Sequence, residues 1–191
     1  MVAKRYIVYA GLALVAVTGV VGVLVFSQLH QKTRQQIKGD QRVPGIGTPK
    51  QKKSIAHLYF ADKDNIFLIS EERTLSHTED PTNFSRKIIE ALINGPSEGL
   101  ARTIPVDTSL RALYITETGI CYVDLSAEVK EKHPGGVQSE LLTLYSIVNS
   151  LVLNIPDIQV VKILIDGQET MTLAGHIDLQ EPVKANMLLI R

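Results

Sequence analysis

The fold is decided by an apolar stretch in the second half of the chain, VQSELLTLYSIVNSLVL (Val137–Leu153). Its large apolar residues recur every three to four positions, which predicts a long amphipathic helix with one buried side. That side consists of Leu141, Leu142, Tyr145, Val148, Leu151 and Val152. Breaks are predicted at both ends, by Pro134-Gly135-Gly136 before the stretch and by Asn154-Ile155-Pro156 after it.

Six other segments show the alternation or the short apolar runs that are typical of strands. They are Ser54–Ala61, Ile66–Ser70, Leu110–Ile115, Ile120–Leu125, Ile158–Ile165 and Thr170–Leu173. Short turn sequences such as Glu117-Thr118-Gly119 indicate that consecutive strands pair as hairpins. A second helix is expected to begin at Pro81 with Asp80 as its cap and to end at Gly95-Pro96.

The order of elements is therefore β-β-α-β-β-α-β-β, which predicts an α+β domain. We expect a mainly antiparallel sheet with the two main helices packed on one face. In the strand Ile158–Ile165 one face is wholly apolar, whereas on the other face Val160 and Leu164 flank Lys162. A sheet face that is neither core nor fully polar predicts a contact surface, and a free strand edge offers a second route to self-association.

The 191-residue chain has no net charge, but its charges are placed unevenly. Residues 1–53 carry nine basic residues and one acidic residue, whereas residues 54–191 carry 11 basic and 19 acidic residues. An acidic domain binds nucleic acid poorly, so we expect no nucleic-acid partner. The single cysteine, Cys121, excludes an intramolecular disulfide, and its alternation with Val123 and Leu125 predicts a core position.

The N-terminal residues predict a membrane anchor. Ile7–Phe26 is a run of twenty uncharged residues, which as a helix spans about 30 Å, the thickness of a bilayer's hydrocarbon core. The run is longer than that of a cleaved signal peptide, so residues 1–29 are predicted to be an uncleaved transmembrane signal anchor. Residues 30–53 are predicted to be a basic flexible linker. The positive charges flanking the span lean toward a cytoplasmic C-terminal domain without deciding the orientation.

Motifs for catalysis or metal binding are weak. Gly95-Pro96-Ser97-Glu98-Gly99 matches the G-x-S-x-G pattern of a nucleophile elbow, and Asp124, Asp166 and His176 follow in the chain order of a hydrolase triad. The elbow requires a strand before the serine, whereas here a predicted helix precedes it. His176 and Asp178 would supply only two ligands, too few for a zinc site. We therefore expect no catalytic residues, no metal ligands and no cofactor.

Nine short motifs follow one another between residues 56 and 182. They are Leu58-Tyr59-Phe60, Glu72-Arg73, Ala91-Leu92-Ile93-Asn94-Gly95-Pro96, Gly99-Leu100, Ile104-Pro105, Val123-Asp124-Leu125-Ser126, Ile147-Val148-Asn149-Ser150-Leu151, Ile165-Asp166-Gly167 and Leu173-Ala174-Gly175-His176. In this combination they resemble the GerMN domain, a family associated with sporulation and bacterial envelope assembly. The resemblance assigns residues 54–191 to the domain and implies a fold similar to the ring-building motif of secretion and sporulation assemblies.

The resemblance also implies a location outside the cytoplasmic membrane and brings no established catalytic site with it. Common members have a lipoprotein signal, whereas this chain has one domain copy and a predicted single-pass span, Ile7–Phe26. We therefore expect a non-catalytic interaction or oligomerisation module at the outer side of the membrane. Its partners would be envelope proteins or further copies of the chain, in sporulation or in envelope assembly.

Two alternatives remain at this point. In the first, the domain binds or hydrolyses peptidoglycan with Ser97 and His176, or with carboxylates in the loops at residues 98–107, and replacing Ser97 and His176 with alanine would test it. In the second, favoured only by the flanking charges, the domain is an adaptor on the cytoplasmic side.

Overall fold

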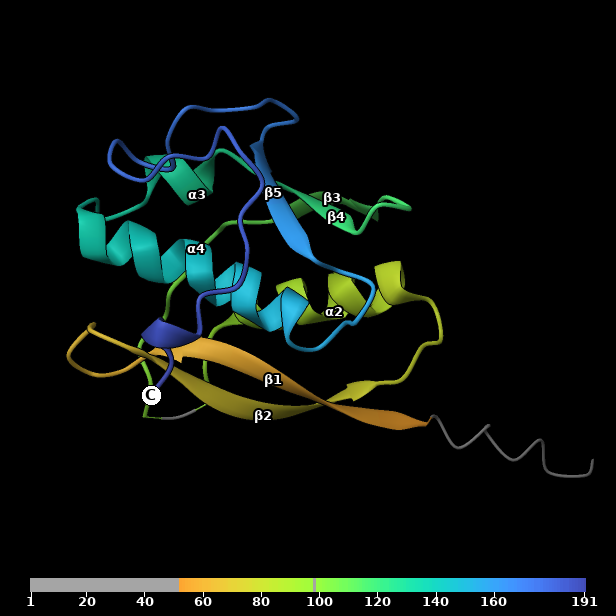
Figure 1. The fold of residues 1–191 in the computed structure, drawn as a ribbon. Coiled ribbons are helices and arrows are strands. Elements are labelled where there is room, and N and C mark those ends of the chain that lie inside the picture. The colour runs from red at the N-terminus through yellow and green to blue at the C-terminus, as the bar shows by residue number, and fades with distance from the viewer. Residues whose placement is uncertain (1–51, 98) are drawn as a thin grey trace, which may run out of the picture. The chain divides into compact units, whose positions relative to one another are not determined.

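The computed structural model of the chain describes residues 52–97 and 99–191, and Figure 1 shows their fold. In chain order the elements of this part are β1 (Lys53–Ala61), β2 (Leu68–Ser76), α2 (Pro81–Asn94), β3 (Leu110–Ile115), β4 (Ile120–Leu125), α3 (Glu128–Glu131), α4 (Val137–Val152), β5 (Val160–Ile165) and the 3₁₀ helix η1 (Met187–Leu189). The predicted anchor, Ile7–Phe26, and almost all of the predicted linker lie outside the described residues. Among the helices described, none is long and apolar enough to cross a membrane.

The helices α2 and α4 lie between two separate sheets, the hairpin β1–β2 and the three-stranded sheet β3-β4-β5 (Figure 1). Helix α4 contacts β1 and β5, and α2 contacts β1 and β3. The predicted α+β class is confirmed, whereas the prediction of one sheet with both helices on one face is wrong. Alternation along a strand shows which side chains are buried, but it does not show which strands share a ladder.

The three-stranded sheet has mixed pairing. β3 and β4 form the predicted antiparallel hairpin. β5 lies on the other side of β4 and runs parallel to it, with Ile120 opposite Val160 and Leu125 opposite Ile165. Parallel neighbours need a long crossover connection. Here α3 and α4 form that connection, which places α4 in the middle of the domain.

The second strand begins later and ends later than predicted. Asp62 Oδ1 accepts a hydrogen bond from the backbone N–H of Ile66 at 2.8 Å, which keeps Ile66 in the turn. Strand β2 then continues through a polar sequence to Ser76, which lies opposite Lys53. The sequence did not predict this part of the strand because its residues are mostly polar. Their side chains do alternate between partly buried and exposed positions, but no apolar alternation marks them.

The predicted return strand Thr170–Leu173 does not form. This segment has only an isolated bridge between Thr172 and Asp178, and the edge of β5 instead pairs with Val183 at Val161. The segment after β5 also crosses the predicted contact face. Lys162 is only 3% exposed, and its ammonium group donates to the carbonyl oxygen atoms of residues 179 and 180. Lys162 therefore holds the segment around residues 179 and 180 against β5, and it is not part of an exposed contact surface.

The boundaries of helix α2 are those expected. Asp80 caps the helix by accepting from the N–H of Thr82 at 3.0 Å, and Pro81 occupies the first turn. Gly95 ends the helix with a φ of +88°, a conformation that favours glycine, and donates its N–H to Leu92 O. Helix α4 begins at the predicted Val137 and ends one residue before the predicted end.

The outer edge of β1 is closed by polar side chains from α4 and the residues after it. Ser146 Oγ donates to Tyr59 O at 2.6 Å, and Ser150 Oγ accepts from Tyr59 N–H at 3.0 Å. The side-chain amide of Asn154 donates to His57 O at 2.7 Å and accepts from His57 N–H at 2.9 Å. These three side chains replace a neighbouring strand, so this edge is not open to another chain.

Replacing Asn154 with alanine should therefore destabilise the domain by about 1–3 kcal/mol, because it leaves the N–H and C=O of His57 without these partners. The free energy of unfolding in urea, measured on residues 52–191, checks this. Gln168→Ala removes an exposed amide side chain and is the matched control. Equal stability of the two variants would show that Asn154 does not support the edge of β1.

Candidate functional site

Ser97 belongs to a hydrogen-bond network at the end of α2. Its N–H donates to Glu71 Oε2 at 2.9 Å, and its hydroxyl donates to Glu71 Oε1 at 3.1 Å. Arg73 pairs with the same carboxylate and donates to Gly95 O. Burial alone would raise the pKa of Glu71, but the hydrogen bonds from Ser97 and Arg73 lower this pKa below its usual value. A carboxylate with a lowered pKa is a weak base, so Glu71 fixes this loop and does not activate the serine.

Arg102 satisfies the last carbonyl groups of α2. Its guanidinium donates to Ile93 O and, at 2.7 Å, to Asn94 O. A Cβ atom at Gly95 would lie 2.6 Å from Arg102 Nη2, so any other residue at position 95 would displace the guanidinium from its present place. The Asn94-Gly95-Pro96 sequence is thus the C-terminal cap of a helix, and a cationic side chain at that end is favourable to the helix dipole.

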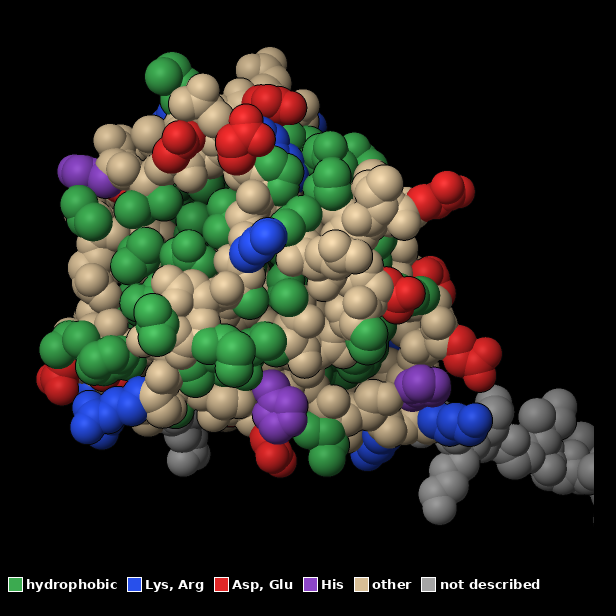
Figure 2. Space-filling model, in the orientation of Figure 1, with side chains coloured by type: hydrophobic (Ala, Val, Ile, Leu, Met, Phe, Trp, Pro, Cys, Tyr) green, Lys and Arg blue, Asp and Glu red, His purple; other side chains and the backbone are tan. Residues whose placement is uncertain are grey.

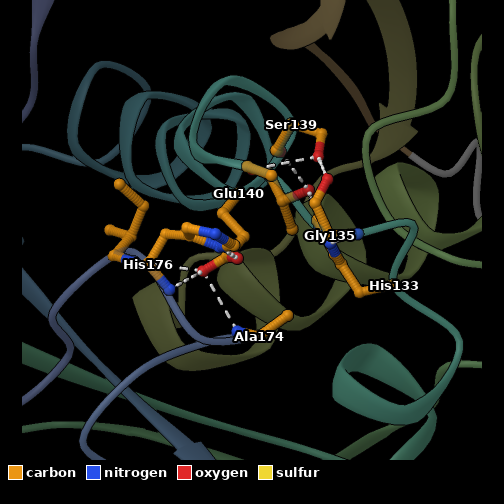
Figure 3. Close-up of polar contacts among 9 residues, drawn as sticks. His133, Gly135, Ser139, Glu140, Ala174 and His176 are labelled. Atoms are coloured by element: carbon orange, nitrogen blue, oxygen red, sulfur yellow. Dashed lines mark hydrogen bonds and ion pairs between the residues drawn. The ribbon is translucent and has the colours of Figure 1, made fainter.

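His176 belongs to a different network, beside the first turn of α4 (Figure 3). There Glu140 has no exposed surface and accepts hydrogen bonds from the N–H groups of Ala174, His176 and Ile177, each at 3.1 Å. His176 Nδ1 lies 2.6 Å from the other carboxylate oxygen. Burial opposes the charge of Glu140, but these hydrogen bonds, that of the His176 ring first, lower its pKa to about 2. The ionised carboxylate therefore clamps the loop 174–177 to α4.

The hydrolase-like set of residues is not assembled. Ser97 contacts Glu71, whereas His176 contacts Glu140, and within residues 52–97 and 99–191 no hydrogen bond joins Ser97 to His176. Asp124 and Asp166 both pair with Arg111, and Asp124 also accepts from the N–H of Gly167 at 2.7 Å. These carboxylates support the turn after β5 and do not orient an imidazole.

The predicted metal-ligand pair also lacks a third member. The described part of the chain contains no group of three His, Cys, Asp or Glu side chains placed to hold a metal ion. Asp178 accepts from the N–H of Gln180 at 2.8 Å, as in a local turn. Cys121 is fully buried, as its alternation predicted, and burial raises the pKa of its thiol to about 12. Such a thiol stays protonated and unreactive.

A groove of about 840 Å³ lies between residues 101–106 and the loop 132–137 before α4. Neither Ser97 nor His176 lines it. Most of its surface is apolar and comes from Ala61, Ala101, Ile104, Pro105, Val106, Pro134, Val137 and Leu142, but charged and polar side chains such as Arg102, Lys132 and His133 also line it. Val106 and Val137 are 62% and 57% exposed. A groove with an apolar wall and a few polar groups has the character of a binding site for a small ligand or a peptide side chain.

His133 and Thr143 form a histidine–hydroxyl pair in the wall of this groove. His133 Nδ1 accepts from the N–H of Gly135 at 3.0 Å, so in the neutral ring Nε2 carries the proton and donates to Thr143 Oγ1 at 2.9 Å. Desolvation lowers the pKa of His133, while the charge of Glu140 opposes this shift. Because the ring donates to the hydroxyl, it does not act as a base toward it, and the pair is structural.

An exposed apolar surface near the C-terminus was not identified by the sequence reasoning. Met187 and Leu188 are 68% and 89% exposed on η1, and Figure 2 shows hydrophobic side chains gathered on the viewed face over α4 and η1. The 3₁₀ helix is held in place because the side-chain amide of Asn149 exchanges two hydrogen bonds with the backbone of Asn186. The sequence signal was the apolar run Met187–Ile190 near the end of an otherwise polar segment.

Comparison with known proteins agrees with this fold. The profile of the Germane family, described as sporulation and spore germination, matches residues 57–170. No curated protein matches the chain. Among solved structures, a Clostridium perfringens protein described as a lipoprotein is similar at 28% identity and a TM-score of 0.51, over 69% of this chain and 87% of that chain.

Two further structures come from the sporulation protein GerM of Bacillus subtilis. Its tandem GerMN domains are similar at 21% identity and a TM-score of 0.59, over 70% of this chain and 46% of that one. Its first GerMN domain is similar at 21% identity and a TM-score of 0.52, over 70% and 96% of the two chains. At this identity the likeness concerns the fold, and it fits a single domain copy within residues 52–191.

Glu140→Gln should destabilise the domain by about 2–4 kcal/mol at pH 7, because a neutral amide replaces a buried ionised acceptor with four donors. The folded pKa of Glu140 lies below its usual 4.5, so its contribution is complete above that value and is lost as the pH falls toward 2. Urea unfolding of residues 52–191 at pH 7 and pH 3 checks both statements. The variant should lose less stability between these pH values than the wild type. An equal loss would contradict the role of ionised Glu140 in holding the loop 174–177 on α4.

Proposed function

Since the chain belongs to the Germane family of sporulation and spore germination, we propose that residues 52–191 form a non-catalytic interaction module of the bacterial cell envelope. The segment Ile7–Phe26 tethers the module to the cytoplasmic membrane in a single pass, and the module lies on the outer side. Its partners are envelope proteins or further copies of the chain, and the process is sporulation or envelope assembly.

The observation that carries this proposal is the fixed, exposed apolar pair Met187 and Leu188. Apolar side chains in water are ordinary when they are scattered on mobile segments. Here the backbone is held on both sides of the pair. Before it, the N–H of Asn186 donates to the side chain of Asn149, and after it, the N–H of Arg191 donates to the carbonyl oxygen of Leu68 in β2. A surface that is apolar and already ordered binds a protein partner without a large ordering cost.

The arrangement of polar groups supports the absence of catalysis. Ser97, Glu71, His133 and Glu140 each support the backbone of a loop or a helix end. The Ser97 hydroxyl donates to a carboxylate, but the lowered pKa of Glu71 makes that carboxylate a weak base. The family is a sporulation domain family and not a known enzyme family, which agrees with this part of the proposal.

A photo-crosslinking residue at position 188 of the full chain, expressed in cells, tests the interaction. We expect protein adducts from Leu188 and none from Thr118, an exposed position in the turn between β3 and β4. Met187→Ser in the same chain should reduce the yield of adducts severalfold. Equal yields from positions 188 and 118 would show that this apolar surface has no dedicated partner.

The location is supported by the uncharged run Ile7–Phe26 and by the similar structure described as a lipoprotein. A reporter that is active only outside the cytoplasm, fused after Arg191, should therefore be active. Removing residues 7–26 should abolish this activity because the chain then lacks its signal for export. An inactive reporter on the intact chain, beside an active cytoplasmic reporter, would place the domain inside the cell.

A further inference from the structure

The hairpin β1–β2 has a second edge, formed by β2. Over five residues of β2, the backbone groups that point to this edge have no hydrogen-bond partner among the described residues. On β1 the N–H and C=O groups of His57 and Tyr59 point away from β2, because they bond side chains from α4 and from Asn154. In an antiparallel ladder, two residues directly opposite each other both point inward or both point outward. Glu72 lies opposite His57 and Ser70 lies opposite Tyr59, so their backbone groups point to the outer edge of β2.

Contacts at the two ends of β2 confirm this direction and limit the open part. The carbonyl of Leu68 accepts from the N–H of Arg191 at 3.0 Å, and Ile190 forms a parallel bridge with Leu68. At the other end the carbonyl of Ser76 accepts from Lys87 Nζ at 2.8 Å. Between these ends, the outward groups of residues 70, 72 and 74 have no hydrogen-bond partner among the described residues. The open edge is therefore Ser70–Thr74.

The side chains of this edge indicate what covers it. Ser70, Glu72 and Thr74 are exposed, and Glu72 at the centre has no ion-pair partner in the described part of the chain. The surrounding domain is acidic, with 11 basic and 19 acidic residues in 54–191. A second copy pairing antiparallel in the register that uses all three outward residues of both copies would place Glu72 opposite Glu72, and like charges at directly opposite positions are destabilising. A basic strand has no such penalty.

We propose that the edge Ser70–Thr74 of β2 pairs with an extended segment of a partner protein that places a lysine or arginine opposite Glu72. The outward N–H and C=O groups of three residues supply the main-chain hydrogen bonds, as in other cases of strand addition to a sheet edge. Glu72 supplies the preference for a basic segment. The inference rests on the proposed function, since it gives the interaction module a class of partner, but it uses a surface other than Met187 and Leu188.

Two labelled heptapeptides test the pairing on the full chain in detergent micelles. One is Thr-Val-Thr-Lys-Thr-Val-Thr, and the other has glutamate in place of its lysine. Binding is measured by fluorescence anisotropy, and hydrogen exchange reports protection of the amides of Ser70, Glu72 and Thr74. We expect the lysine peptide to bind about three- to fivefold more tightly than the glutamate peptide and to protect these amides.

Substitutions in β2 separate pairing from charge. Thr74→Pro removes an outward N–H while leaving the ladder with β1 intact, and it should abolish binding of both peptides. Thr74→Val keeps that N–H and should bind normally. Glu72→Lys should reverse the order of the two peptides, a result that a purely structural role of Glu72 would not produce.

Three results would overturn the proposal. The first is the absence of binding and of amide protection with both peptides, which would mean that Glu72 only prevents other strands from pairing with this edge. The second is binding that Thr74→Pro leaves unchanged. The third is a dimer of the full chain in analytical ultracentrifugation that Thr74→Pro dissociates, since the occupant would then be a second copy. Thr74→Pro leaves Met187 and Leu188 unchanged, so adducts at position 188 that persist in this variant while peptide binding is absent contradict this inference alone, whereas loss of the adducts at position 188 contradicts the proposed function.

Discussion

The structure depends on hydrogen bonds from the buried polar side chains of α4 to backbone groups of the surrounding segments. Glu140 holds the loop 174–177, Thr143 donates to Thr103 O, and Asn149 holds the backbone of Asn186. Ser146 and Ser150 close the edge of β1. Buried backbone groups must have partners, and a helix placed between two sheets reaches segments that no strand pairs. Helix α4 therefore contributes apolar side chains to the core and also supplies the polar contacts that fix the loops around it.

This arrangement explains why residues typical of catalytic sites occur here without forming one. A serine, a histidine and several carboxylates lie in short motifs, but their hydrogen bonds hold neighbouring loops and helix ends in place. Glu71 holds the loop after α2, whereas Glu140 holds the loop that contains His176. The lowered pKa values of both carboxylates follow from the donors around them, and such acids remain ionised acceptors at neutral pH. In this chain the two carboxylates therefore support the fold.

Besides the groove before α4, the described residues present two surfaces of different kinds. One is apolar, with Met187 and Leu188 on a 3₁₀ helix that Asn149 holds in place. The other is the backbone edge of β2, which has the exposed Glu72 at its centre. Both surfaces belong to segments that the rest of the domain already orders. Ordered contact surfaces of this kind are suited to binding a partner protein, because little ordering cost is paid on binding.

The sequence by itself determined the two main helices, most of the strands and part of the core, although on α4 the predicted core residues Leu141, Tyr145 and Val152 are only partly buried. The reason is that a period of 3.6 or 2 and the capping residues Asp80 and Gly95 act locally. It also determined that Ser97 follows a helix, which argued against a nucleophile elbow. Only the tertiary structure decided that the strands form two sheets, that β5 runs parallel to β4, and that Lys162 and Glu140 are buried with partners. These features depend on contacts between residues distant in the chain, and neither a hydrophobic period nor a turn sequence specifies which distant segment supplies the partner.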